Sequence, residues 1–423
     1  MTSRTWAVVV LVVLVVATGV LAALLVPWRE APAPRADQLA ALQTLPAAQV
    51  ARGREFAAAL RPATYLAMAV GLLAALVLGL TPLGARIVTA VARPFGGHWV
   101  AQAALGGLVI VFLGSLVTLP FAAWRRIELQ RFGLSTQGWG GWAADLLKGY
   151  ALTAIIGGLA LLGFYGLARL APRSWWAWGA AGAAGLVVLL SFALPVLIEP
   201  VFNKFAPMPD SPLRTQLIAL ADRDGVPVKD VLVADASRRT NQVNAYVSGF
   251  GATRRIVVYD TLLKQADDAE VVSVVAHELG HAKHNDVLTG TALGALGAAT
   301  GVVAIYLLGS WTGLLRRAGV SGIDEPRAVA LVFAVVAVAG LLAGPLENLV
   351  SRHIEARADT HALVLTHAPG TFERMQARLA EINLANVDPN PVEFALFASH
   401  PSTVQRMAAA IAFARAHPGT ATP

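Results

Sequence analysis

The sequence predicts a mainly α-helical membrane protein in which a bundle of seven transmembrane helices carries a small α+β domain. Three observations predict this fold. Only 14% of the 423 residues are charged and 56% are hydrophobic, whereas about a quarter of a soluble domain is charged. Seven apolar runs contain no Asp, Glu, Lys or Arg. The insert between the fifth and the sixth of these runs has the composition of a soluble domain. A disordered chain and an ordinary soluble enzyme are therefore excluded.

The positive charge of the chain does not indicate nucleic-acid binding. The formal net charge is +7 at pH 7, but the basic residues are scattered between apolar runs, as residues that flank membrane spans are. We therefore expect the lipid bilayer as a partner and no nucleic acid. The sequence has no cysteine, so any metal ion must be bound by His, Asp or Glu.

Each apolar run approaches or exceeds the roughly 20 residues that cross about 30 Å of hydrocarbon as a helix. Tryptophans mark several ends, such as Trp99 and Trp124 around the third run, as expected at a membrane interface. We expect the first run to be a retained span, because its apolar core is longer than the roughly 7–15 residues of a signal sequence. The runs cover residues 6–28, 63–80, 101–124, 149–168, 177–198, 287–314 and 328–345.

Two regions break the membrane pattern. The insert at 199–286 holds 10 basic and 12 acidic residues among 88, so 25% of it is charged. The tail at 346–423 is similarly mixed, whereas residues 81–100 are expected to be a loop or an interfacial segment. We therefore divide the chain into spans 1–5 (1–198), the soluble insert (199–286), spans 6 and 7 (287–345) and a C-terminal helical region (346–423).

Within the insert, three short β-branched or aromatic segments predict strands at 230–235, 243–250 and 254–260. The following residues, 266–284, predict a helix with acidic residues in its first turn. This helix contains an H-E-x-x-H motif, formed by His277, Glu278 and His281. Residues four apart share one helical face, so both imidazoles can reach one metal ion.

Zinc suits this motif, because it accepts imidazole nitrogen and carboxylate oxygen and, in catalytic sites, leaves one position for water. Glu278 can then accept the proton of that water as it attacks a peptide carbonyl. The alternative is a pair of surface histidines, which is disfavoured because two histidines in a Val/Ala-rich helix are costly to bury without a metal. We expect His284 at the helix end and not as a further ligand, because four protein ligands would close the site.

A third ligand is available after the seventh run. Glu355 and Asp359 are four residues apart and therefore lie on one helical face. Glu355 can complete the metal site, and Asp359 can accept the free ring N–H of a metal-bound histidine and orient it. The alternative, a solvated carboxylate face on a charged helix, is left open by the spacing.

With these motifs the chain resembles the M48 family of membrane zinc metallopeptidases, specifically the Ste24-type CAAX prenyl protease subfamily. In that family an H-E-x-x-H helix is followed, one pair of spans later, by an E-x-x-x-D helix. The sequence departs from prenyl-protease relatives at Ala282, often Trp, at Asp286, often His, and at Ser402, usually Pro. Further matching segments are Ile198 to Phe205, Asn244 to Leu263, Asn383-Leu384 and Ser399-His400-Pro401.

The resemblance implies a fold and roles that spacing alone does not show. It implies that the seven helices enclose a chamber and that the soluble part is a gluzincin-like zinc protease domain binding one Zn²⁺ per chain. Asn244 is implied to lie on an edge strand that pairs with an extended peptide substrate. His400 and Arg406 are implied to act as catalytic residues that stabilise the oxyanion.

We therefore expect an integral membrane zinc endopeptidase. Its substrates are peptides or proteins, either prenylated CAAX tails or, as in bacterial quality control of membrane proteins, unprenylated membrane-associated ones. A different class, a non-catalytic membrane scaffold or zinc-binding protein, is opposed by Glu278, which metal storage does not need. Basic residues after the first and third runs favour a multi-pass protein of the cell membrane with its active site facing the cytoplasm.

Overall fold

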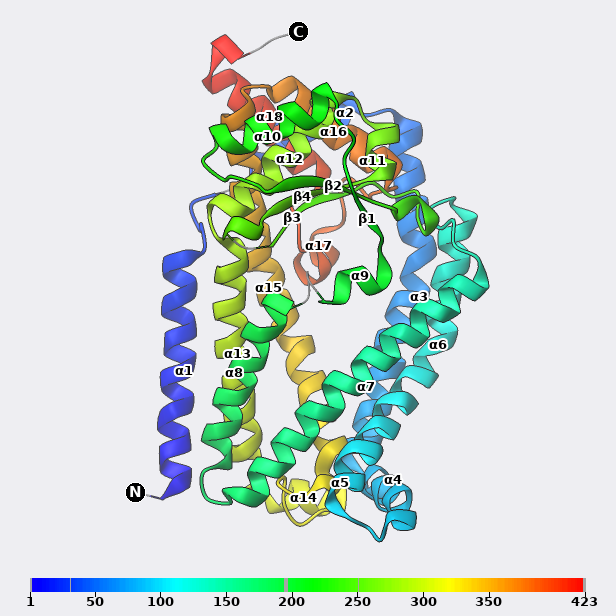
Figure 1. The fold of residues 1–423 in the computed structure, drawn as a ribbon, viewed down its shortest axis with the longest axis vertical. Coiled ribbons are helices and arrows are strands. Elements are labelled where there is room, and N and C mark those ends of the chain that lie inside the picture. The colour runs from blue at the N-terminus through cyan, green and yellow to red at the C-terminus, as the bar shows by residue number, and fades with distance from the viewer. Residues whose placement is uncertain (1, 31, 194–196, 250, 421–423) are drawn as a thin grey trace.

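The computed structural model describes residues 2–30, 32–193, 197–249 and 251–420, and it shows a helical bundle below a small sheet (Figure 1). Within these residues seven helices are long and apolar enough to cross a membrane, and each coincides with one predicted run, although α1, α8 and α13 end before the last residues of their runs. Residues 194–196 of the fifth run and Phe250 of the second predicted strand lie outside the described residues. The seven are α1 (Ser3–Leu25), α3 (Ala47–Leu80), the α5 to α6 segment (Trp99–Arg131), α7 (Trp139–Leu170), α8 (Trp175–Ala193), α13 (Asp286–Leu308) and the η6 to α15 segment (Pro326–Thr366).

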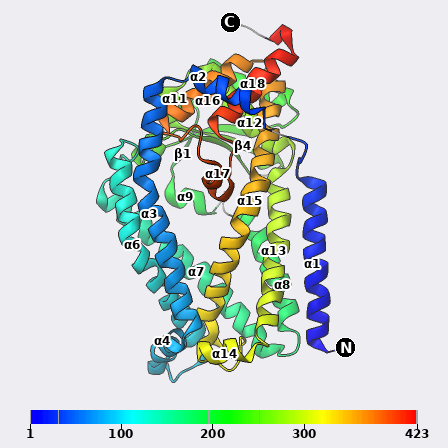
Figure 2. The ribbon, with the colours of Figure 1, turned by 180° about the vertical axis from the view of Figure 1, so that it is seen from behind.

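The segment at 81–100, predicted to be a loop or interfacial, is helical over most of its length. The helix α4 (Pro82–Ala92) begins with proline at its first position, and the hydroxyl of Thr81 accepts a hydrogen bond from the backbone N–H of Leu83 at 3.3 Å. Proline is well tolerated there because its missing N–H would have no partner inside the helix. With α14 (Thr312–Ala318), α4 lies at the end of the bundle farthest from the sheet (Figures 1 and 2).

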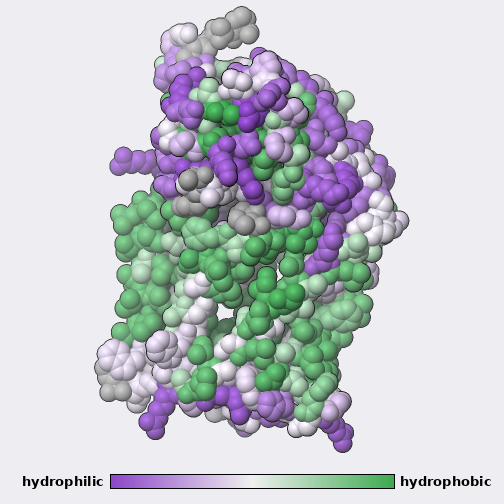
Figure 3. Space-filling view, in the orientation of Figure 1, coloured by the Kyte–Doolittle hydropathy of each residue, from purple (hydrophilic) through white to green (hydrophobic). Residues whose placement is uncertain are grey.

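The spans do not form one tight bundle. α1 stands at the edge and packs against α13, which also packs against α8, whereas α3 packs against both α6 (Gly107–Arg131) and α15 (Val329–Thr366) (Figure 2). The surface of this part is predominantly hydrophobic, and openings remain between the spans when all side chains are drawn (Figure 3). The bundle is therefore hollowed between its helices, in accordance with the expected chamber.

A four-stranded sheet lies above the spans, in the order β1-β2-β4-β3. β2 (Asp230–Ala234) and β4 (Arg255–Tyr259) are parallel, while β1 (Phe205–Pro207) and β3 (Ala245–Ser248) pair antiparallel to their neighbours. Three strands match the predicted segments, and β1 was not predicted. β3 is an edge strand of the sheet, so the side of β3 that faces away from β4 can pair with a further strand.

Helices cover the face of the sheet that points away from the spans (Figure 1). The core between them is built from side chains such as Leu217, Ile256, Val275, Leu279 and Met375, all essentially inaccessible to solvent. On the other face α9 and α17 lie between the sheet and the spans. The helices of this upper part are α2 (Arg35–Thr44), α10 (Pro212–Arg223), α11 (Asp260–Gln265), α12 (Asp268–Lys283), α16 (Pro369–Ile382) and α18 (Thr403–Ala416), with α9 (Glu199–Phe202) and α17 (Pro391–Phe397) below the sheet.

The seventh span and the predicted E-x-x-x-D helix are one continuous element. α15 runs for 38 residues and includes Pro345, so the domain boundary expected at 345/346 falls inside it. The helix carries the chain from the membrane region directly to Glu355 and Asp359. These two side chains are therefore held at the end of a span and not on a flexible connection.

Close helix packing in the bundle depends on glycine at one contact between α3 and α15. A Cβ atom at Gly79 would lie 2.6 Å from the carbonyl oxygen of Ala330 and closer still to the Cβ of Ala334. We therefore predict that Gly79→Ala destabilises the protein by about 1–3 kcal/mol, as overpacking does. The measurement is the midpoint of thermal unfolding of the purified protein in detergent.

Gly163 of α7 supplies the matched control, because a Cβ atom there would meet nothing within 4 Å. Gly163→Ala should leave the midpoint unchanged or raise it slightly, since alanine is the better helix former. Equal midpoints for the two variants would contradict the proposed dependence on Gly79.

Candidate metal centre

The two motif histidines are placed by a well-capped and deeply buried helix. At the start of α12, Asp267 and Glu270 form a reciprocal capping box, and the buried Glu270 carboxylate is ion-paired with Arg378 of α16 at 2.8 Å. The apolar face of α12 packs into the core of the domain. The opposite face presents His277 and His281 toward α15.

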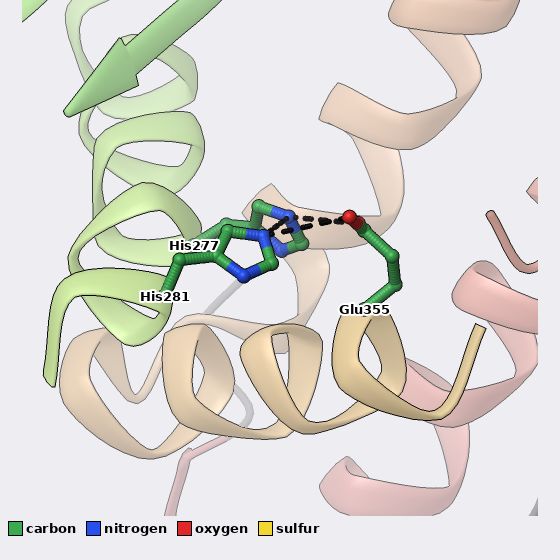
Figure 4. A group of neighbouring side chains, drawn as sticks. All are labelled: His277, His281 and Glu355. Atoms are coloured by element: carbon green, nitrogen blue, oxygen red, sulfur yellow. Dashed lines mark hydrogen bonds and ion pairs between the residues drawn. The ribbon is translucent and has the colours of Figure 1, made fainter. Parts of the chain in front are cut away.

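His277, His281 and Glu355 converge on one point (Figure 4). One potential ligand atom from each lies within 4.8 Å of the others. The two Nε2 atoms of the histidines are 3.2 Å apart, and the Glu355 oxygens lie 3.2 Å from Nε2 of His277 and 3.6 Å from Nε2 of His281. The three residues predicted to bind a metal are therefore brought together from two helices, although His277 and Glu355 are 78 positions apart in the sequence.

The donor set fits a divalent cation. Oε2 of Glu355 is buried and lies 3.2 Å from Nε2 of His277 without a well-aligned hydrogen bond, an arrangement that is costly for a carboxylate oxygen unless a cation is present. Burial lowers the pKa of His277, but the neighbouring carboxylates of Asp359 and Glu355 raise it to about 9. The environment thus favours positive charge at this point, and two imidazoles with one carboxylate are ligands that zinc accepts.

His277 is oriented by a buried carboxylate behind it. Its Nδ1 atom lies 2.8 Å from Oδ1 of Asp359, a residue that is only 2% exposed. Arg406 of α18 pairs with both oxygens of Asp359, with its Nε 2.8 Å from Oδ2. The guanidinium also approaches Nδ1 of His277 at 3.2 Å. Asp359 therefore lies where a group that holds the histidine tautomer must lie.

His281 has a matching pair of partners that the sequence did not predict. Its Nδ1 atom lies 2.9 Å from Oδ2 of the buried Asp286, and the other oxygen of Asp286 pairs with Arg357. Asp286 is the first residue of α13, five positions after His281, and Arg357 follows Glu355 by two. The sequence marked Asp286 as a departure from prenyl-protease relatives, but it did not indicate that this side chain contacts His281.

Glu278 is half-buried on α12, between the two histidines in sequence. Burial raises the pKa of this carboxyl, while the neighbouring histidines lower it. A carboxyl group with a raised pKa exchanges protons more readily near neutral pH than an ordinary glutamate. This position and environment suit a general base.

The remaining predicted residues lie at different distances from the cluster. Nε2 of His400 lies 3.3 Å from Oε1 of Glu355, and Nδ1 is 2.9 Å from the hydroxyl of Ser399. The His400 side chain is 59% exposed, so it lies at the open side of the cluster. Asn244 is exposed and directly precedes β3, where its carbonyl accepts a hydrogen bond from Tyr259 at 3.0 Å.

Comparison with known families accounts for most of the chain. The sequence model of peptidase family M48 matches residues 207–413. A second model, described as the CAAX prenyl protease N-terminal region with five membrane helices, matches residues 58–204. The first match contains all of the clustered residues described above.

Individual relatives agree with these matches. A Bacillus subtilis protein named uncharacterized metalloprotease YhfN is 32% identical over 303 residues, 71% of each chain. The CAAX prenyl protease 1 homolog of Arabidopsis thaliana is 32% identical over 299 residues, 70% of each chain. CAAX prenyl protease 1 of Saccharomyces cerevisiae is 27% identical over 315 residues, 70% of this chain and 69% of its own.

The fold also has a solved counterpart. The crystal structure of S. mikatae Ste24p matches with a TM-score of 0.75 and 21% identity, covering 96% of this chain and 98% of that one. Membership of the matched family implies a metal ion, peptide or protein substrates and a membrane environment. The chain belongs to peptidase family M48, among its membrane metalloproteases related to CAAX prenyl protease 1.

Proposed function

We propose that the chain is a zinc-dependent endopeptidase in which His277, His281 and Glu355 hold one Zn²⁺ and Glu278 is the general base. The observation that carries this proposal is the convergence of the three side chains, with the buried Glu355 carboxylate directed at the two histidine Nε2 atoms. When bound there, zinc would polarise the peptide carbonyl and lower the pKa of water.

The residues of the chain have distinct parts in peptide hydrolysis. Glu278 accepts a proton from the attacking water and donates it to the amine that leaves, a role that its raised pKa favours. Asp359 and Asp286 each hold one histidine through its Nδ1 atom, which keeps both Nε2 atoms directed at the metal. Arg406 and Arg357 hold these two carboxylates in turn.

Substrate binding is assigned to the open edge of the sheet. An extended peptide can add to β3 beside Asn244 through backbone hydrogen bonds, because β4 is the one strand paired with β3 in the described part of the chain. His400, exposed beside Glu355, can donate a hydrogen bond to the oxyanion that develops during attack. Arg406 contacts Asp359 and Nδ1 of His277, whereas Nε2 of His277 is the atom directed at Glu355, so its contribution is electrostatic and passes through Asp359.

We further propose that the substrates are membrane-associated and that the active site faces the cytoplasm of the cell membrane. The clustered residues lie at the end of the spans where Arg125, Arg126 and Arg131 follow the third run, which the positive-inside rule assigns to the cytoplasm. Two substrate classes fit this position, prenylated CAAX tails and unprenylated membrane proteins. The names of the plant and yeast relatives favour the first.

Replacing the general base separates catalysis from metal binding. Glu278→Gln removes the proton acceptor but leaves the three ligands, so zinc should remain bound while peptide cleavage falls by at least about 100-fold, the typical contribution of general acid–base catalysis. The measurement combines zinc content by atomic absorption with cleavage of matched farnesylated and unprenylated fluorogenic peptides. Removal of zinc with a chelator should abolish cleavage by the wild-type protein.

Glu381→Gln, which changes an exposed carboxylate of α16 outside the cluster, is the control and should cleave like wild type. Unchanged cleavage by Glu278→Gln, or full cleavage after complete removal of metal, would refute the proposed mechanism. Cleavage of the farnesylated peptide alone would assign the prenylated class of substrates.

The second carboxylate–histidine pair supplies a further prediction. Asp286→Ala removes the partner of His281 Nδ1 and leaves Arg357 unpaired, so zinc affinity should fall about 10- to 100-fold. The measurement is competition for zinc with a chelator of known affinity. Asp268→Asn, at the exposed start of α12, is the matched control, and equal affinities in the two variants would show that Asp286 does not support the site.

A further inference from the structure

A basic pocket lies apart from the metal centre, where the end of α6, the loop to α7 and the segment before β3 meet. Its volume is about 320 Å³. The charged side chains that line it are all arginines, namely Arg125, Arg126 and Arg239, accompanied by polar groups of the two connecting segments. No acidic residue is among its lining residues, so the pocket offers an excess of positive charge.

Arg126 is buried in the wall of this pocket and held in place by its neighbours. The residue is only 3% exposed, and its guanidinium lies over the rings of Trp139 and Trp142, 4.6 Å and 5.6 Å from their centroids. One Nη atom donates to the carbonyl of Gln137. Its Nε atom is buried with no hydrogen-bond partner. A buried guanidinium with an unused donor is costly unless a ligand accepts that hydrogen bond.

The other two arginines also retain donors. Arg239 binds the side chain of Asn203 and lies 3.8 Å from Asp145, but its Nε atom is buried without a partner. Arg125 is exposed and makes no hydrogen bond or ion pair with the residues that the structure describes. Among the residues that the structure describes, the three guanidinium groups around this pocket thus form an ion pair with one carboxylate, that of Asp145.

The surroundings place this pocket at the membrane interface. Trp124 ends the third apolar run directly before Arg125, and Trp139 begins α7. Ile127 and Trp139 are about half exposed, at 50% and 49%. Exposed apolar side chains next to arginines are typical of the boundary between hydrocarbon and lipid headgroups. Basic pockets at such positions bind anionic headgroups.

We propose that this pocket binds the phosphate of an anionic phospholipid headgroup through Arg125, Arg126 and Arg239. Guanidinium groups match phosphate oxygens with paired hydrogen bonds, and the unused Nε donors of Arg126 and Arg239 supply them. The acyl chains would lie against the exposed apolar side chains of α6 and α7. The site is independent of the peptidase chemistry.

A peptide carboxylate is the competing occupant, because Gln242 of the pocket lies two residues before Asn244 at the edge strand. The apolar side chains beside the arginines favour the lipid. They offer a surface to hydrocarbon that a peptide terminus does not need.

The test measures lipid binding to the purified full-length protein by native mass spectrometry in detergent. Phosphatidylglycerol should bind more tightly than phosphatidylcholine. Arg126→Gln should lower the affinity for phosphatidylglycerol at least about tenfold, the loss expected of one hydrogen bond between charged groups. Arg125→Gln, which alters an exposed side chain, should also weaken it and keeps the test valid if Arg126→Gln does not fold. The double variant Arg316→Gln/Arg317→Gln, at the opposite end of the bundle, should bind like wild type.

Equal affinities for the two lipids, or an equal loss in the Arg316/Arg317 control, would overturn the proposal. Tight binding of inorganic phosphate that displaces the lipid would reassign the pocket to free phosphate. Displacement by a peptide with a free C-terminus but not by its amide would reassign it to the substrate. Glu278→Gln should keep its lipid binding, so failure of the peptidase proposal and failure of this one are distinguishable.

Discussion

The contact of His277 with Glu355 on one side and Asp359 on the other is the interaction on which the rest of the structure depends. It brings α12 against α15, and it requires a close approach of the two helices. A Cβ atom at Gly280 would lie 3.2 Å from the Cα of Ala358, so glycine within the H-E-x-x-H motif permits this approach. Because imidazoles and carboxylates are buried together, the contact is stable only when cations balance it. Arg406 supplies one cation, and the metal ion proposed to bind here would supply the other.

The membrane bundle and the candidate metal centre share two helices, α13 and α15. Glu355 belongs to the same uninterrupted helix as the seventh span, and Asp286 begins the sixth. Glu355, a proposed metal ligand, and Asp286, which contacts His281, therefore take their positions from two spans, whereas His277 and His281 come from the domain above. A movement of α13 relative to α15 would displace Asp286 from Arg357 and would thus reach His281 directly. Through these contacts, the packing of the spans would influence the affinity of the proposed site for metal.

The sequence predicted those parts of the structure that depend on local patterns. Apolar runs located the spans, and helical spacing paired His277 with His281 and Glu355 with Asp359. The strand β1 was missed because three residues, one of them Pro207, carry no periodic signal. Asp286 and Arg357 were missed because their contact joins two helices, and no spacing within either predicts it. Residues that support a ligand across helices become visible only when the packing is known.

Uncharged spans also determine how the electrostatics of the protein are arranged. Charges are expensive in hydrocarbon, so the arginines that follow the third run collect at its interfacial end, the end that also carries the sheet and the metal centre (Figures 1 and 3). Arg126 remains buried there because the faces of two tryptophans stabilise its charge. The arginines at the end of α6 and the open edge of β3 consequently lie at the same end of the bundle (Figure 1). An anionic leaflet would hold this end of the protein against the headgroups, where a membrane-associated peptide can reach the edge strand.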